Sequence, residues 1–262
     1  MNVDLPKLHF SKLMRAVVEF RMIEDGDRIM VGLSGGKDSL FLLYALVYLR
    51  EKLAVKFDLA ALNINPMFSE KFSTVEMKRF CDELNVPFTA RDVDIKSAIE
   101  AKGKPCFTCS FFRRGAINRV AKEMGMNKVA YAHHNDDAVE TFFMNLICSG
   151  QLSVFLPVTY LDRTNITVIR PLIYFRESEI KDAAKLCGFS PTPSLCPYDG
   201  NTQRARTKEI ISTLGKDSTD LYEHLRSAMR VSALGELWPA EKKRKEMKED
   251  YFRYMKRDCE KN

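Results

Sequence analysis

The sequence predicts an α/β fold, in which a parallel sheet is flanked by helices and followed by a helical C-terminal extension. Two observations predict it. Short apolar stretches alternate along the chain with segments of helical periodicity. A glycine-rich turn also joins the first apolar stretch to a helical pattern, as happens where parallel sheets bind ligands at their carboxyl edge. The 262 residues, with 45% hydrophobic and 29% charged content, are typical of a globular protein with an ample core.

Three strands are expected in the first half of the chain. Residues 6–22 place apolar side chains at helical spacing and so predict a helix before the first strand. Short, mostly apolar runs are typical of strands buried in a parallel sheet. Such runs occur at residues 28–33, 57–64 and 86–93. Helical patterns separate them at residues 40–52 and 70–85.

The second half continues the alternation up to about residue 190. After a short helix comes a loop containing Cys106, and then a helix over residues 110–124 that ends at Gly125. Further strands are expected at residues 128–132 and 166–170, and further helices at residues 136–148 and 176–186. From Ser190 onward, prolines mark an irregular stretch that is followed by helices and a charged tail.

The first strand and the following helix are joined by a glycine-rich motif, Ser34-Gly35-Gly36-Lys37-Asp38-Ser39. The two glycines let the backbone approach an anion closely, while Lys37 and the helix N-terminus supply positive charge. Asp38 is placed to help hold a magnesium ion. The phosphate loop of kinases and GTPases differs, because it has glycine where Val31 stands and serine or threonine where Asp38 stands. A glycine turn capped by serine and aspartate is the alternative interpretation.

This motif resembles the PP-loop of the N-type ATP pyrophosphatases, whose signature is Ser-Gly-Gly-x-Asp-Ser. The resemblance implies a Rossmann-like sheet, cleavage of ATP between the α- and β-phosphates, and transfer of AMP to a carbonyl oxygen. Residues 34–39 are then ATP-binding, and Lys37 and Asp38 are also catalytic. We expect an N-terminal helix over residues 1–22, an ATP-binding domain over 23–190, and a mainly helical region over 191–262.

Seven cysteines are present, at positions 81, 106, 109, 148, 187, 196 and 259. Their odd number, in a chain that begins without a hydrophobic signal core, argues against a disulfide framework. The spacing Cys106-Phe-Thr-Cys109 suits half a zinc site, a redox pair or part of an iron–sulfur site. Cys196, in a proline-rich loop, is the candidate for a third ligand. The other cysteines are expected in helices or near the C-terminus.

Taken together, these motifs resemble the tRNA 2-thiocytidine synthetase family from about Phe20 to Leu214. The matching segments are the PP-loop, Cys106-x-x-Cys109-x-x-x-Arg113-Arg114-Gly115, His133-His134-x-Asp136-Asp137, Ile169-Arg170-Pro171-Leu172 and Leu195-Cys196. The resemblance implies that Cys106, Cys109 and Cys196 hold a 4Fe–4S cluster with one iron free of protein ligands. It implies tRNA as the substrate, thiolated at a cytidine of the anticodon loop. It also suggests a sulfide or persulfide donor such as a cysteine desulfurase, and a homodimer.

Polar residues near the expected site complete the prediction. His133 and Asp136 are expected to bind ATP, and Asp137 is expected to be catalytic, because all three follow the strand at residues 128–132. Asp136 or Asp137 could bind magnesium or position the base, and capping of the next helix by Asn135 and Asp136 is the plain alternative. Arg113 is expected to contact phosphates of ATP or RNA, with surface charge as the alternative. His134 is left outside the chemistry.

The net charge of +6 favours a polyanionic partner. RNA contacts are expected from Arg204, Arg206, Lys208 and the basic run at residues 242–245. No apolar stretch reaches the roughly 18 residues that a membrane span needs, so a cytoplasmic location without membrane association is expected.

Three functions compete at this point. The first is an ATP-dependent, iron–sulfur tRNA thiolase. The second is a PP-loop enzyme of another kind, either an amide-forming ligase or a thiolase of another RNA or a small molecule, in which the cysteines bind structural zinc. The third is a non-catalytic redox or nucleotide sensor. Metal content separates the first from the second.

Overall fold

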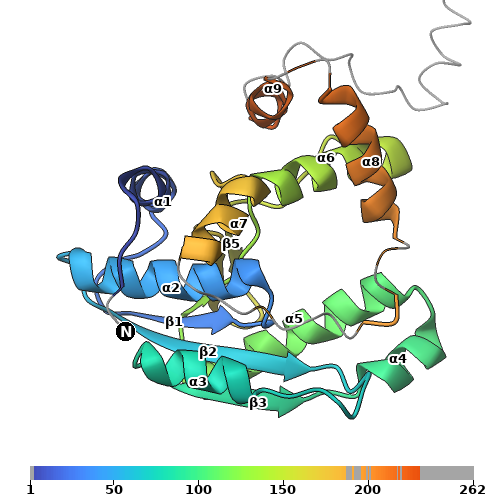
Figure 1. Cartoon of the computed structure of the whole chain (residues 1–262). Helices are drawn as coiled ribbons and strands as arrows, with labels where there is room; N and C mark the ends of the chain where they lie inside the picture. The colour runs from blue at the N-terminus through green and yellow to red at the C-terminus, as the bar shows by residue number, and fades with distance from the viewer. Residues whose placement is uncertain are drawn as a thin grey trace, which may run out of the picture.

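A six-stranded sheet forms the centre of the structure, which is a computed structural model (Figure 1). Residues 3–186, 191, 196–198, 200, 202–216, 218 and 220–230 are described. The strands, in the spatial order β3-β2-β1-β4-β6-β5, are β1 (Asp27–Gly32), β2 (Phe57–Asn65), β3 (Phe88–Asp92), β4 (Lys128–Ala130), β5 (Val158–Leu161) and β6 (Ile166–Ile169). All neighbours pair in parallel except β5 and β6. The predicted parallel sheet is therefore confirmed.

Helices connect the strands and cover both faces of the sheet (Figure 1). They are α1 (Lys7–Glu19), α2 (Lys37–Lys52), α3 (Val75–Glu83), α4 (Ile95–Lys102), α5 (Pro105–Glu123), α6 (Asn135–Ser149), α7 (Glu177–Leu186), α8 (Gln203–Leu214) and α9 (Leu221–Ala228). None of them is long and apolar enough to cross a bilayer, as far as the described residues extend.

The alternation of side chains along the strands builds two hydrophobic cores. Ile29 and Val31 of β1 face the core made with α1, α2, α3 and α7, whereas Met30 faces the smaller core made with α5. Leu59 and Leu62 of β2 divide in the same way. This division follows from the two-residue period of a strand and explains why the strands are apolar throughout.

One expectation about local structure is wrong, and one strand was not predicted. The CxxC motif was expected in a loop, yet Cys106 and Cys109 lie in the first turns of α5. Proline is well suited to a first helical turn, and Pro105 stands there; the Thr108 hydroxyl also donates to the Gly103 carbonyl at 2.7 Å. Strand β5, which the sequence did not predict, pairs antiparallel with β6 and forms an edge of the sheet.

The proposed division of the chain at residues 22 and 190 stays a prediction. Helix α8 lies beside α6 in the structure, so the C-terminal region packs against the preceding domain. Cys187, Cys259 and the basic run at residues 242–245 lie outside the described residues.

Truncation of Phe41 should destabilise the protein strongly. This side chain of α2 is fully buried in the larger core, so Phe41→Ala is expected to lower the free energy of unfolding by about 3–5 kcal/mol. Phe107→Ala is the matched control, because Phe107 is 67% exposed and its loss should cost at most about 0.5 kcal/mol. Urea unfolding followed by circular dichroism measures both. Equal destabilisation by the two substitutions would contradict the assignment of the core.

Candidate active site

The turn after β1 is held in shape by the last residue of the glycine-rich motif. The Ser39 hydroxyl accepts a hydrogen bond from the Ser34 backbone N–H at 3.1 Å and donates one to the Gly36 carbonyl at 2.9 Å. Gly35 has φ +82°, a conformation that glycine adopts without strain. Because α2 begins at Lys37, the loop and the positive end of the helix dipole lie together. The local geometry therefore suits the binding of phosphate.

Two acidic groups meet the lysine of this loop. Lys37 Nζ lies 3.1 Å from Asp38 Oδ2 and 3.3 Å from Glu177 Oε1. Burial opposes the charge on Lys37, but the two carboxylates outweigh this effect and raise its pKa. The other oxygen of Asp38, Oδ1, is buried and accepts no hydrogen bond from the described residues. A buried carboxylate oxygen in this position is a ligand that a magnesium ion accepts.

The segment after β4 contributes a reciprocal cap to α6. The His134 backbone N–H donates to Asp137 Oδ2 at 3.0 Å, and the Asp137 N–H donates to His134 Nδ1 at 3.4 Å. His134 is therefore the N-cap, in place of the Asn135 or Asp136 that the sequence suggested. Its Nε2 also lies 3.9 Å from Asp38 Oδ1. His134, which the sequence interpretation left outside the chemistry, thus lies between the glycine-rich loop and the start of α6.

Asp136 serves as an anchor for α7. It accepts hydrogen bonds from Arg176 Nε at 3.0 Å, Arg176 Nη2 at 3.3 Å and the Glu177 backbone N–H at 3.0 Å. Both carboxylate oxygens are thus used within the protein. The structure supports a positioning role for Asp136, and the predicted contact of this residue with ATP stays a prediction.

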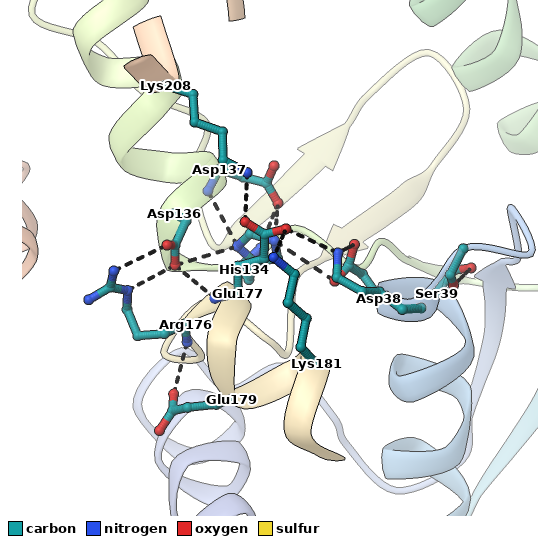
Figure 2. A network of polar contacts seen from close by, with 12 residues as sticks. Asp38, Ser39, His134, Asp136, Asp137, Arg176, Glu177, Glu179, Lys181 and Lys208 are labelled. Atoms are coloured by element: carbon teal, nitrogen blue, oxygen red, sulfur yellow. Dashed lines mark hydrogen bonds and ion pairs between the residues drawn. The ribbon is translucent and has the colours of Figure 1, made fainter. Parts of the chain in front are cut away.

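Helices α7 and α8 bring charged side chains to the site (Figure 2). The sequence interpretation did not predict one of them, Glu177. Arg204 and Lys208 were assigned to RNA. In the structure Arg204 Nη1 lies 2.8 Å from Asp137 Oδ1, and Lys208 Nζ lies 2.6 Å from Glu177 Oε2. Glu177 follows a parallel strand whose carboxyl end faces the site. That position along the chain is the signal that could have revealed it.

His133 precedes the cap of α6 and packs among aromatic rings, with Asp137 and Arg170 close enough to act on its charge. Its ring packs against Phe155 with centroids 4.9 Å apart and against Tyr131 at 5.9 Å. Burial lowers the pKa of His133 to about 4, although Asp137 acts in the opposite direction. The imidazole is therefore neutral at pH 7. Its Nδ1 has no hydrogen-bond partner among the described residues.

Cys109 lies near both of the other predicted cysteine ligands, Cys106 and Cys196. Burial raises the pKa of the Cys109 thiol, and the nearby Cys196 and Cys106 raise it further, while Arg113 lowers it. Arg113, predicted to contact phosphates, thus lies beside Cys109, and its Nε is buried without a hydrogen bond to the described residues. Three neighbouring thiols with one cation fit the thiolate ligation of an iron–sulfur cluster. Within the described chain, no three His, Cys, Asp or Glu side chains are placed to hold a single metal ion.

Aromatic rings surround the cysteines and leave apolar surface exposed. Phe107 and Phe111, one turn apart on α5, are mostly exposed and stack with centroids 6.4 Å apart. Tyr198 lies close in sequence to Cys196 and contacts Phe68 edge-on. Exposed rings can stack on the bases of single-stranded RNA.

Comparison with known proteins identifies relatives over most of the chain. Residues 7–190 match the model of the PP-loop domain family. The tRNA-cytidine(32) 2-sulfurtransferase of Aliivibrio salmonicida is 38% identical over 221 residues, which cover 82% of this chain and 72% of that protein. The protein of the same name from Syntrophotalea carbinolica is 36% identical over 231 residues, covering 86% and 87%.

A solved structure shows the same fold. The U34-tRNA thiolase NcsA from Methanococcus maripaludis, determined with its [4Fe–4S] cluster, has a TM-score of 0.72 to this chain at 24% identity. The match covers 90% of this chain and 80% of that one. At this identity the similarity establishes the arrangement of helices and strands alone.

Substitution of His133 should remove part of the pH dependence of stability. The unfolded histidine takes up a proton below about pH 6.5, whereas in the folded protein its pKa is about 4. Stability should therefore fall as the pH drops from 6.5 towards 4, by at most about 1.4 kcal/mol per pH unit. In His133→Asn this contribution is absent. Urea unfolding of both proteins at several pH values measures it, and parallel curves would refute the expected burial.

Proposed function

This chain belongs to the PP-loop family of tRNA 2-sulfurtransferases, and we propose that it replaces the C2 oxygen of cytidine 32 in tRNA by sulfur at the expense of ATP. The observation that carries the proposal is the proximity of Cys109 to both Cys106 and Cys196, in a chain that also has the ATP loop. Cys106 and Cys109 are in the first turns of α5. Helices α4 and α5 follow β3, and the start of α5 lies beyond the carboxyl ends of β2 and β3 (Figure 1). The same edge carries the loop after β1.

The first reaction step activates the base. The C2 carbonyl oxygen attacks the α-phosphorus of ATP, the bond to the β-phosphate oxygen breaks, and pyrophosphate leaves. Lys37, the loop N–H groups and the N-terminus of α2 are placed to stabilise the negative charge on the leaving group. Asp38, whose Oδ1 has no hydrogen bond within the described chain, is the residue we assign to magnesium.

The second step introduces sulfur. A sulfide sulfur attacks C2, the C–O bond breaks, and the former carbonyl oxygen leaves as part of AMP. The overall conversion turns cytidine, ATP and hydrogen sulfide ion into 2-thiocytidine, AMP and pyrophosphate, with no net oxidation or reduction. The proposal also includes tRNA as the substrate, a homodimer and a cytoplasmic location. Where a cysteine desulfurase is the donor, a thiol reductant has to release sulfide from its persulfide and is itself oxidised to a disulfide.

Cys106, Cys109 and Cys196 would hold the cluster. When bound, the cluster supplies a site at which sulfide is held for the attack. Arg113 contributes positive charge beside Cys109, which favours the thiolate form that ligation requires and attracts anionic sulfide.

Loss of one thiol should remove both iron and activity. We expect anaerobically purified protein to contain about four iron atoms per chain, and Cys109→Ala and Cys196→Ala to lose the iron and at least about 100-fold of the tRNA thiolation rate. Cys148→Ala is the matched control, since this exposed thiol near the end of α6 should be dispensable. Metal analysis and mass spectrometry of nucleosides provide the measurements. Stoichiometric zinc without iron would reject the cluster and favour an amide-forming ligase.

Removal of the loop lysine should abolish thiolation in cells. Cells that lack this protein are expected to lose 2-thiocytidine from tRNA, and the wild-type gene should restore it. Lys37→Ala should restore less than about 1% of it, because one charge-assisted contact to the departing pyrophosphate contributes a factor of about 100 or more. An unchanged nucleoside profile in the deletion strain would show that the substrate is another RNA or a small molecule.

A further inference from the structure

Three lysines from three helices surround one carboxylate beside the ATP loop. Glu177 Oε1 lies 3.3 Å from Lys37 Nζ of α2 and 3.2 Å from Lys181 Nζ of α7, and Glu177 Oε2 lies 2.6 Å from Lys208 Nζ of α8. Figure 2 shows Lys181 and Lys208 on opposite sides of Glu177, with Asp38 close by. The cluster thus joins the loop to two helices that lie far from it in sequence.

Glu177 is shared among more ammonium groups than it has carboxylate oxygens. One carboxylate faces three lysines. It raises the pKa of Lys208, and two carboxylates of α6 that lie further out, Glu140 and Asp136, raise it as well. Burial opposes the ionisation of Glu177, but hydrogen bonds from Lys208 and Lys181 outweigh it and hold its pKa at about 2. Asp38 offsets part of the charge of Lys37 alone. The three ammonium groups repel one another, and an anion that contacts all three, as Glu177 does here, offsets this repulsion.

An ordinary surface ion pair does not explain the arrangement. Lys181 and Glu177 stand four residues apart on one helix, as do Lys78 and Asp82 on α3, where no further lysine of the described residues is paired with the carboxylate. Lys208, by contrast, comes from α8, and Lys37 comes from the loop itself. Helices α2 and α7, which pack together, also begin at Lys37 and Glu177, so two positive helix ends meet at the cluster.

We propose that Lys181 and Lys208 form, together with Lys37, a subsite for the β- and γ-phosphates of ATP, which retains pyrophosphate after cleavage. In the nucleotide-free protein Glu177 occupies this subsite and competes with the phosphates for the three ammonium groups. The inference rests on the proposed function, because it assumes that ATP is cleaved between the α- and β-phosphates. It assigns to two lysines outside the glycine-rich motif a direct contact with the leaving group.

Titration calorimetry with inorganic pyrophosphate tests the subsite on the full-length protein. The titrations contain EDTA, so that magnesium does not contribute. Lys181→Ala and Lys208→Ala should each weaken pyrophosphate binding about 10-fold, since each removes one charge-assisted contact. Both should change AMP binding less than about 2-fold. Lys78→Ala is the matched control, because it removes the same type of helix ion pair at a distance from the loop.

A second variant guards against misfolding as the cause. Glu177→Gln removes the competing carboxylate and should tighten pyrophosphate binding about 10-fold, which damage to the fold would not do. Pyrophosphate affinities within 2-fold of wild type in both lysine variants would overturn the subsite, as would weaker binding in Glu177→Gln. The titration needs neither tRNA nor sulfide. A protein with the expected pyrophosphate affinities but no thiolation would refute the proposed function and leave the subsite standing.

Discussion

The order of the strands decides where the chemistry of this protein can take place. Strand β1 lies at the middle of the parallel sheet, with β2 on one side and β4 on the other, so the direction in which the chain advances reverses between β1 and β4. The segments that leave the carboxyl ends of these two strands diverge and expose backbone N–H groups and side chains between them. The loop of residues 34–39 and the segment of residues 133–137 are these two segments. Charged residues of the site, such as Asp38 and Asp137, lie on these two segments or form ion pairs with them.

The acidic residues Asp136 and Glu177, which meet at the start of α7, have different roles. Asp136 is held by two guanidinium contacts and a backbone N–H, so it fixes the start of α7. Glu177, one residue after Arg176, is shared among ammonium groups that flexible side chains carry, and an arriving anion can replace it. The contacts of Asp136 keep α7 in place before nucleotide binds. The contacts of Glu177 with the lysines can be exchanged, so the lysines remain available to phosphate.

The sequence was sufficient for the features that depend on local pattern. The five parallel strands could be predicted from short apolar runs, and the loop from the motif Ser34–Ser39. Both depend on residues that are adjacent in the sequence. The sequence predicted that α5 begins at residue 110, whereas it begins at Pro105. The sequence interpretation placed the CxxC motif in a loop and did not use the preference of proline for the first turn of a helix. Glu177 escaped prediction because its contacts with Lys37 and Lys208 join segments far apart in the chain, and the same holds for the approach of His134 to Asp38. Strand β5 depends likewise on its pairing with β6.

The separation of these charges along the chain also governs the order in which the site forms during synthesis. A ribosome delivers Lys37 early, whereas Glu177 and Lys208 emerge much later, and N-terminal segments begin to fold first. A growing chain that ends before α7 therefore holds the glycine-rich turn but lacks both Glu177 and Lys208. Nucleotide that binds the completed site stabilises only the finished fold. Cellular ATP would then favour chains in which the last helices have docked, and truncated chains would gain no such protection.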